Sequence, residues 1–242
     1  MQPKGGAGKS FVAVHLVQFL RESGKTVLPL DLDSSNNTLS QFEALKASAL
    51  DIQLEDNEHR VDARKFDEHL ETIINSKATD VVMDIGASIY NPFSAHIVEI
   101  EFFTMLKDSG IEAIIHVPIS GGQGLLDNMG GLQSVSALAG ENGKFVIWTN
   151  RFFGDLELNG VPFEKGNLFK SLKTSILGIV KIPRWSSDTV QFDVETMMKS
   201  KLTYDEVLTS DKFKIFTKSR LKKVKAEFFA NIAAAGFLDT TP

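Results

Sequence analysis

The stretch Lys4-Gly5-Gly6-Ala7-Gly8-Lys9-Ser10 decides the fold of this chain. Its glycines let the backbone curl so that successive amide N–H groups point toward phosphate oxygens. In such a P-loop Lys9 reaches the β- and γ-phosphates of a nucleotide, and the Ser10 hydroxyl ligates Mg²⁺. A glycine-rich turn that only introduces a helix would not require Gly-Lys-Ser at the helix start. The stretch therefore predicts a site for a nucleoside triphosphate with magnesium. The expected nucleotide-binding residues here are Gly5, Gly6, Ala7, Gly8, Lys9, Ser10 and Phe11.

The sequence before the loop is unusually short. Only Met1, Gln2 and Pro3 precede it. A P-loop ordinarily joins a buried strand to a helix, because the strand fixes the loop and the helix N-terminus faces the phosphate. We therefore expect the central strand to be missing and favour a misplaced start at an internal methionine, since a natural domain without that strand would leave its sheet neighbours unpaired. Pro3 also occupies a usual glycine position and has no N–H to donate.

Composition limits the class of protein. The chain has 242 residues, a hydrophobic fraction of 43%, no cysteine and a net charge of −5. This length fits one α/β domain with a sizeable core. Without cysteine there is no disulfide and no thiolate zinc site. No apolar run is long enough to span a membrane and no signal peptide precedes the loop, so we expect a cytoplasmic protein. The acidic balance argues against coating nucleic acid with the whole surface and leaves a local basic patch open.

Apolar runs alternate with amphipathic segments along the chain. This alternation predicts a three-layer fold, with a mostly parallel sheet covered by helices on both faces. Strands are expected at 26–32, 80–85, 111–119, 144–150 and 179–182. Helices are expected at 11–23, 39–48, 62–76, 94–109, 125–138, 167–177, 188–201, 203–210 and 212–235. A loop should run through Pro92 and an irregular hairpin should occupy 151–166. No linker divides the chain, so we expect a single domain over 1–242 with a helical C-terminal segment from 188.

The first lysine of the loop narrows the class further. Lys-Gly-Gly-x-Gly-Lys-Ser resembles the deviant Walker A motif of the ParA/MinD family of P-loop ATPases. In that family the lysine matching Lys4 reaches across a dimer interface to the partner's nucleotide. The resemblance implies an ATP-bound homodimer in which Lys4 and Lys9 help to neutralise charge during phosphoryl transfer. The alternative is a surface lysine that lies beside a phosphate.

Further segments match this family in the right order, up to about residue 185. Asp31-Leu32-Asp33 resembles its first switch, which makes Asp33 the candidate for positioning the attacking water and Asp31 a supporting residue of the metal shell. Both could instead cap the next turn. Asp84 ends a strand that looks like Walker B and would hold Mg²⁺ through water. Ile85-Gly86-Ala87-Ser88 departs from the usual second switch, where Gly86 could offer an N–H to the γ-phosphate.

Two later positions bear on the base. Asn150 ends a strand similar to the family's base-reading strand and offers both a donor and an acceptor to adenine. Pro183 resembles the proline that packs on the base. A turn-forming asparagine and a strand-ending proline are the competing interpretations. No Asn-Lys-x-Asp run follows Asn150, which favours ATP over GTP.

The resemblance implies an ATP-dependent dimerisation switch with slow, partner-stimulated hydrolysis. Ile85-Gly86-Ala87-Ser88 and Ser120-Gly121-Gly122-Gln123 look most like the plasmid TraL/StbB-like branch, linked to conjugation and stability, with partition ATPases as near competitors. A plasmid-encoded protein partner is therefore expected. The alternatives are a P-loop small-molecule kinase or ligase, for which the sequence offers no arginine-rich lid, and a nucleotide-binding scaffold without turnover.

The segment Lys212–Lys225 is rich in lysine. It could contact DNA non-specifically, lie on a membrane surface, or form the solvated face of a packed helix, and the acidic net charge weakens the first two interpretations. The apolar residues at helical spacing, which favour packing, are Ile215, Leu221, Val224, Phe228 and Ile232. The five histidines show no paired spacing that would indicate a metal site.

Overall fold

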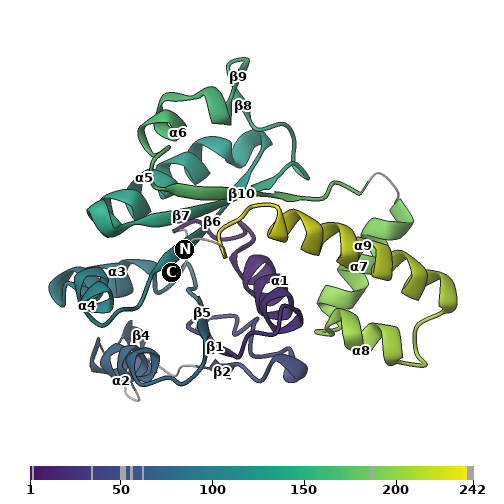
Figure 1. Ribbon diagram of the computed structural model, residues 1–242, viewed down its shortest axis with the longest axis horizontal. Coiled ribbons are helices and arrows are strands. Elements are labelled where there is room, and N and C mark those ends of the chain that lie inside the picture. Colours follow the sequence, from purple (N-terminus) through teal and green to yellow (C-terminus); the bar gives the residue numbers. More distant parts are fainter. Residues whose placement is uncertain are drawn as a thin grey trace.

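The structure, a computed structural model, describes residue 1 and residues 3–33, 35–49, 53–54, 57–61, 63–185 and 188–238. Its strands form two three-stranded parallel sheets (Figure 1). The strands of the first sheet, in spatial order, are β2 (Ser48–Ala49), β1 (Val27–Asp31) and β5 (Asp80–Asp84). Those of the second sheet are β10 (Ile176–Ile182), β7 (Lys144–Asn150) and β6 (Ile114–Ser120). The expected α/β architecture with parallel sheets and flanking helices is confirmed.

The strand register brings polar residues to one edge. Asp31 is opposite Asp84 in the pairing of β1 with β5, and Ser120 is opposite Asn150 in the pairing of β6 with β7. The strands between these ends are apolar and largely buried. Since the carboxyl ends of parallel strands meet at the same edge, this edge is where a ligand site belongs in an open α/β sheet.

The two sheets face each other through β5 and β6 without pairing. Within the described residues no strand lies between them. A cavity of about 510 Å³ occupies this position and is lined from both strands, from α1 (Lys9–Glu22), and by Met1 and Phe237. The amino group of Met1 donates to the His116 carbonyl of β6 at 2.6 Å. The helix α1 contacts both β5 and β6 and so connects the two sheets.

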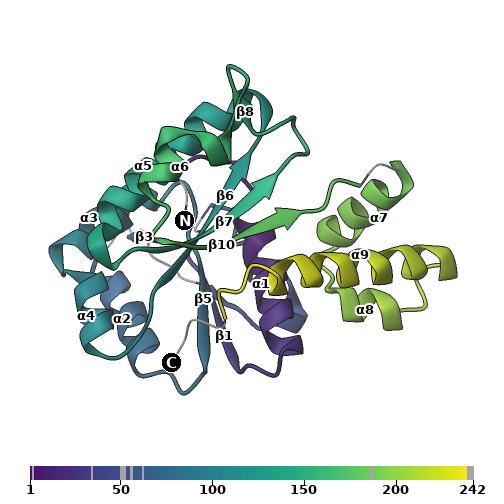
Figure 2. The same cartoon turned by 45° about the horizontal axis from the view of Figure 1, so that its top comes forward.

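Helices cover both faces of the sheets. Apolar side chains of α1 pack with the C-terminal helices on one face, while the other face carries one group of helices over β1 and β5 and another over β6 and β7. The C-terminal helices form an arm beside α1 (Figure 2). The remaining helices are α2 (Ala63–Ile74), α3 (Tyr90–Glu99), α4 (Phe102–Asp108), α5 (Leu125–Ala139), α6 (Asn167–Ser171), α7 (Asp188–Lys199), α8 (Tyr204–Thr209) and α9 (Ile215–Ala233).

Two short hairpins and four 3₁₀ turns complete the described elements. The hairpins are β3 (Gln53–Leu54) with β4 (Asn57–Val61) and β8 (Glu157–Leu158) with β9 (Val161–Pro162). The 3₁₀ turns are η1 (Glu43–Leu45), η2 (Gly122–Gly124), η3 (Gly140–Asn142) and η4 (Phe163–Lys165). The hairpin expected within 151–166 is confirmed.

Several local predictions were wrong. The helix expected over 167–177 is cut short, because α6 ends at Ser171 and residues 176–177 already belong to β10. Residues 39–48 form turns, η1 and the start of β2 rather than a helix, because the Ser40 amide donates to Asp31 and Lys46 adopts a left-handed φ of 51°. The helix expected over 94–109 is split into α3 and α4 at Glu101, whose φ is 49°. Pro92 lies in the first turn of α3 and not in a loop. A helix tolerates proline in its first turn, because the N–H groups there have no partners within the helix.

The arm helix α9 is buried on one side only. Leu221, Val224, Phe228 and Ile232 are buried as expected. Ile215 was expected on the same face, yet its side chain is 75% exposed, since it begins the helix at the far end of the arm. In the described part of the chain no helix has the length and apolar character that a membrane crossing requires.

Candidate nucleotide-binding site

The predicted P-loop leads directly into α1. Gly6 and Gly8 have φ values of 73° and 96°, which residues with a side chain rarely adopt. Gly8 stands just before the helix, and Lys9 and Ser10 are its first two residues. The N–H groups of a first helical turn have no partners within the helix, and the positive end of the helix dipole lies there. The local geometry therefore suits an anion, as the sequence indicated.

The ammonium of Lys9 lies over this loop. Its Nζ donates to the Lys4 carbonyl at 2.9 Å. Burial lowers the pKa of Lys9, while the carboxylates of Asp84 and Asp33 act in the opposite direction. The Lys9 ammonium is therefore positioned between the loop and two carboxylates. Its one hydrogen bond to the loop is to a neutral carbonyl, and a phosphate oxygen could replace that carbonyl as its partner.

Asp84 and Ser10 meet at the end of β5. Asp84 is 3% exposed, and the Ser10 side chain lies close enough to lower the pKa of its carboxyl. Burial raises the pKa of Asp84 from 3.8 to about 6, and the charge of Asp31 adds to this, while the Ser10 side chain, the N-terminal amine and Lys9 lower it. Oδ2 of Asp84 is buried without a hydrogen-bond partner among the described residues. A bound cation would supply the missing partner of this buried oxygen.

This pair fits magnesium bound together with a nucleotide. Mg²⁺ is usually held by one or two protein oxygens, with waters and phosphate oxygens completing its shell. The described residues contain no cluster of three or more metal-ligating His, Cys, Asp or Glu side chains, so the protein alone offers no complete cage. Ser10 and Asp84 would provide the protein's share. Asp31 acts on this site through the charge it contributes next to Asp84.

Both candidate switch carboxylates make local hydrogen bonds. Asp31 is fully buried and accepts from the amides of Asp33 at 3.0 Å and Ser40 at 2.8 Å. Asp33 accepts from the Ser35 and Asn36 amides and from the Asn36 side chain. These contacts are the turn-capping interactions that the sequence left open. A water-positioning role for Asp33 stays a prediction.

The structure explains why glycine follows the Walker B strand at position 86. A Cβ on Gly86 would lie 2.6 Å from Cγ of Asp33 and 2.8 Å from its Cα. No side chain fits there without moving Asp33. The loops after β1 and β5 are therefore packed against each other through this glycine, so the two candidate switches are in direct contact.

The two predicted base residues lie on adjacent strands. Asn150 pairs with Ile182 in the register of β7 and β10, and Pro183 follows immediately. Oδ1 of Asn150 accepts from the Phe152 amide at 2.9 Å, which is the turn-forming contact considered from the sequence. Asn150 and Pro183 are thus brought together at the edge that carries the P-loop, and their contact with a base stays a prediction.

The Lys4 side chain, unlike that of Lys9, contacts α5. Its ammonium forms an ion pair with Asp127, in the first turn of α5, and the two side chains are 38% and 65% exposed. A pocket of about 280 Å³ adjoins this pair. It is lined by Lys4, Gly5, Gly6, Ala7, Ser120, Gly121, Gln123, Gly124, Asn128 and Phe153. Sequence reasoning missed Asp127 and Phe153, although the glycine pair after the strand ending at Ser120 signals a close backbone approach.

Known proteins resemble this chain along nearly all of its length. A model of the CobQ/CobB/MinD/ParA nucleotide-binding domain matches residues 1–117. Two Escherichia coli proteins named TraL are 33% and 32% identical over 238 residues, which is 98% of this chain and 97% of each relative. Among solved structures, MinD of Aquifex aeolicus matches with a TM-score of 0.52 at 16% identity, covering 95% of both chains.

The structural match supports the fold alone, because its sequence identity is low. The match to the TraL proteins covers nearly all of both chains and includes the segments that form the site. The chain therefore belongs to the TraL proteins of the ParA/MinD family, which carry a P-loop nucleotide-binding domain.

Proposed function

We propose that this protein is an ATP-dependent dimerisation switch. Two copies would close on two molecules of Mg²⁺-ATP, hydrolyse them slowly and separate. The observation that carries the proposal is the position of Lys4. Its ammonium is paired with Asp127 of α5, whose side chain is 65% exposed, and the phosphates of a second copy could reach it there. A lysine serving only its own nucleotide would be expected inside the cradle, as Lys9 is.

The other site residues support binding of the nucleotide. The P-loop amides and Lys9 would hold the phosphates, with Ser10 and Asp84 holding magnesium. Bound Mg²⁺ would neutralise phosphate charge and Asp84 together, which satisfies the orphaned Oδ2. Asp33 is the candidate for orienting the attacking water, while Asn150 and Pro183 are the candidates for contact with adenine.

Release of Lys4 from Asp127 should be easy. Ion pairs between exposed side chains contribute about 0–1 kcal/mol, because water screens them and both side chains lose freedom. Two or three charge-assisted hydrogen bonds to phosphate would exceed this, at about 1.5–3 kcal/mol each. The Lys4–Asp127 pair therefore acts as a weak resting position that a nucleotide-loaded partner overcomes.

The biological output is proposed from the relatives. Their name, TraL, favours a role in plasmid conjugation, with stability and partition as neighbouring possibilities. One of the structural matches, with a TM-score of 0.52 at 15% identity over 95% of this chain and 93% of the other, is a MinC:MinD complex of Aquifex aeolicus. By analogy we propose a plasmid-encoded protein partner that times hydrolysis in the cytoplasm.

DNA contact through Lys212–Lys225 remains a subordinate proposal. Arg220 is paired with Asp193 at 2.5 Å, and Lys225 is paired with Glu22 and Asp205, so these two cations support packing of the arm. No ion pair within the described residues involves the other five lysines. These are Lys212, Lys214, Lys218, Lys222 and Lys223. Such lysines would bind phosphate in a strongly salt-dependent way.

Sedimentation with ATP and with ADP tests the switch. We expect dimers with Mg²⁺-ATP and monomers with ADP, and Lys4→Ala should remain monomeric while still binding ATP. Lys25→Ala, which removes an exposed lysine just beyond α1, is the matched control and should dimerise normally. Wild-type protein that stays monomeric with ATP would refute the switch. A Lys4→Ala variant that dimerises like wild type would refute the role of Lys4. A kinase or ligase would instead require turnover that depends on an acceptor molecule.

A further inference from the structure

A short loop beside the cradle carries two exposed aromatic rings. Phe152 and Phe153 follow β7, and their side chains are 46% and 62% exposed. The rings meet edge to face, with centroids 4.8 Å apart and an interplanar angle of 87°. Two rings exposed together offer apolar area to a partner, and each would stabilise a contact by about 1.5–3 kcal/mol on burial.

The loop is fixed by contacts between backbones. The Gly121 amide donates to the Asn150 carbonyl at 2.9 Å, and the Gly122 amide donates to the Asp155 carbonyl at 3.3 Å. A Cβ on Gly121 or Gly122 would collide with the carbonyl oxygens of Gly154 and Phe153, respectively. The aromatic pair is therefore held in place before anything binds, which reduces the conformational entropy lost on binding.

The loop adjoins the surface that Lys4 occupies. Phe153 lines the same pocket as Lys4 and the P-loop glycines. Leu126, whose side chain is 59% exposed, immediately precedes Asp127. An exposed aromatic side chain thus lies next to Lys4 of the ion pair. An apolar anchor surrounded by polar and charged groups is the usual composition of a protein–protein interface.

The charges on this surface indicate what could bind to it. The surface presents Lys4 as a cation and Asp127 as an anion, and a nucleotide in the cradle would add negative charge beside them. In a dimer with a twofold axis, the Lys4 of each copy would face the phosphates of the other, which would make this surface complementary to itself. Nucleic acid or an anionic membrane would instead meet the carboxylates of Asp127 and Asp155.

We propose that Phe152 and Phe153 anchor a second copy of this chain across the nucleotide. This inference rests on the proposed ATP-dependent dimer and adds the residues that hold it together. Truncation of such an anchor commonly weakens an interface by tenfold or more. Because the rings are exposed in the single copy, their removal should leave the stability of the monomer nearly unchanged.

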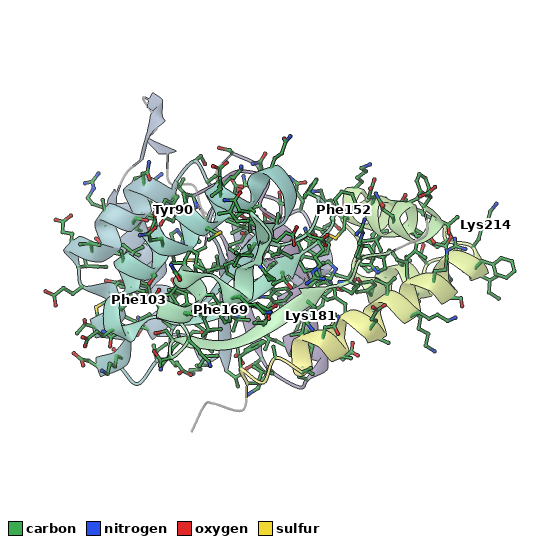
Figure 3. The ribbon with its side chains drawn as sticks, turned by 90° about the horizontal axis from the view of Figure 1, so that it is seen from above. Tyr90, Phe103, Phe152, Phe169, Lys181 and Lys214 are labelled. Atoms are coloured by element: carbon green, nitrogen blue, oxygen red, sulfur yellow. The ribbon has the colours of Figure 1, made fainter. Side chains whose placement is uncertain are left out.

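The test compares Phe153→Ala with Phe216→Ala by sedimentation in Mg²⁺-ATP. Phe216 is 74% exposed in the first turn of α9. It follows two residues after Lys214, which lies at the far end of the arm from Phe152 (Figure 3). We expect Phe153→Ala to weaken ATP-dependent dimerisation by at least about tenfold. Phe216→Ala should dimerise like wild type. A fluorescent ATP analogue, titrated at a protein concentration where the chain is monomeric, should bind Phe153→Ala within about twofold of wild type.

A thiol label gives a second, independent readout. The chain has no cysteine, so Arg151→Cys places a unique thiol next to the aromatic pair. ATP should protect this thiol from a maleimide, whereas the thiol of Val161→Cys, on the β8–β9 hairpin, should stay reactive. Normal dimerisation of Phe153→Ala, or an Arg151→Cys thiol that ATP does not protect, overturns this inference while the switch stands. Weaker nucleotide binding by monomeric Phe153→Ala would assign the loop to the base and also overturn it. Wild-type protein that stays monomeric overturns both proposals.

Discussion

Replacement of Asp84 by asparagine should stabilise the ligand-free protein at neutral and alkaline pH. The pKa of this carboxyl is raised from 3.8 to about 6, mainly by burial. A raised carboxyl pKa means that ionisation opposes folding. This penalty is absent below the ordinary pKa and complete above the folded one. A shift of about two units corresponds to about 3 kcal/mol, which is an upper estimate for the gain from Asp84→Asn.

Thermal unfolding without nucleotide measures this gain. For a chain of this size about 3 kcal/mol raises Tm by about 6–12 °C, so a clear difference is expected at pH 8. At pH 5 only about half of the penalty has developed, and the difference between variant and wild type should shrink accordingly. Asp80→Asn, at the opposite end of β5, is the control and should change the free energy of unfolding by less than about 0.5 kcal/mol.

Magnesium should reverse the ranking of the two proteins. Mg²⁺-ATP should stabilise wild type and should do so much less for Asp84→Asn, which lacks the negative charge that holds the ion. Equal stability of the two proteins at pH 8, or a difference that does not fall toward pH 5, would refute the reasoning that Asp84 is a destabilising buried charge kept for a cation.

Further changes test the neighbouring contacts. Gly86→Ala should displace Asp33 and destabilise the protein by about 1–3 kcal/mol. It should reduce ATP hydrolysis more than nucleotide binding. Normal turnover in a phosphate-release assay would contradict the packing of the two switches. Asp127→Asn should free Lys4 and tighten ATP-dependent dimerisation by up to about fivefold in sedimentation, whereas weaker dimers would show that Asp127 is not a resting partner. Exchange of Lys222 and Lys223 for glutamate should abolish any DNA retention seen at low salt, and retention that persists would remove α9 as the contact.

The chemistry of the cradle could be predicted from sequence because its residues are close together in the chain or stand at strand ends. The P-loop fixes Lys9 and Ser10 locally, and the parallel register then brings Asp84 opposite Asp31 at the same edge. Asp127 and Phe153 could not be found in this way. Their relation to Lys4 depends on how α5 and the loop after β7 pack beside the P-loop, which no local pattern encodes.

The errors in secondary structure have a common cause. Residues 39–48 contain enough apolar side chains for a helix, but a hydrogen bond from Ser40 to the distant Asp31 favours a turn. Ile215 fits the helical period of α9, yet the helix extends beyond the surface that buries its later residues. Periodicity identifies the side of a helix that could be buried, and only the tertiary structure determines how far along its length a partner surface extends.

The contact of α1 with both described sheets has a consequence for how the protein responds to a nucleotide. This helix packs against β5 of one sheet and against β6 of the other. The P-loop leads directly into α1. A nucleotide bound at the P-loop would stabilise the start of α1 and, through it, both sheets, so its arrival should be felt as slower amide exchange in strands that it never touches.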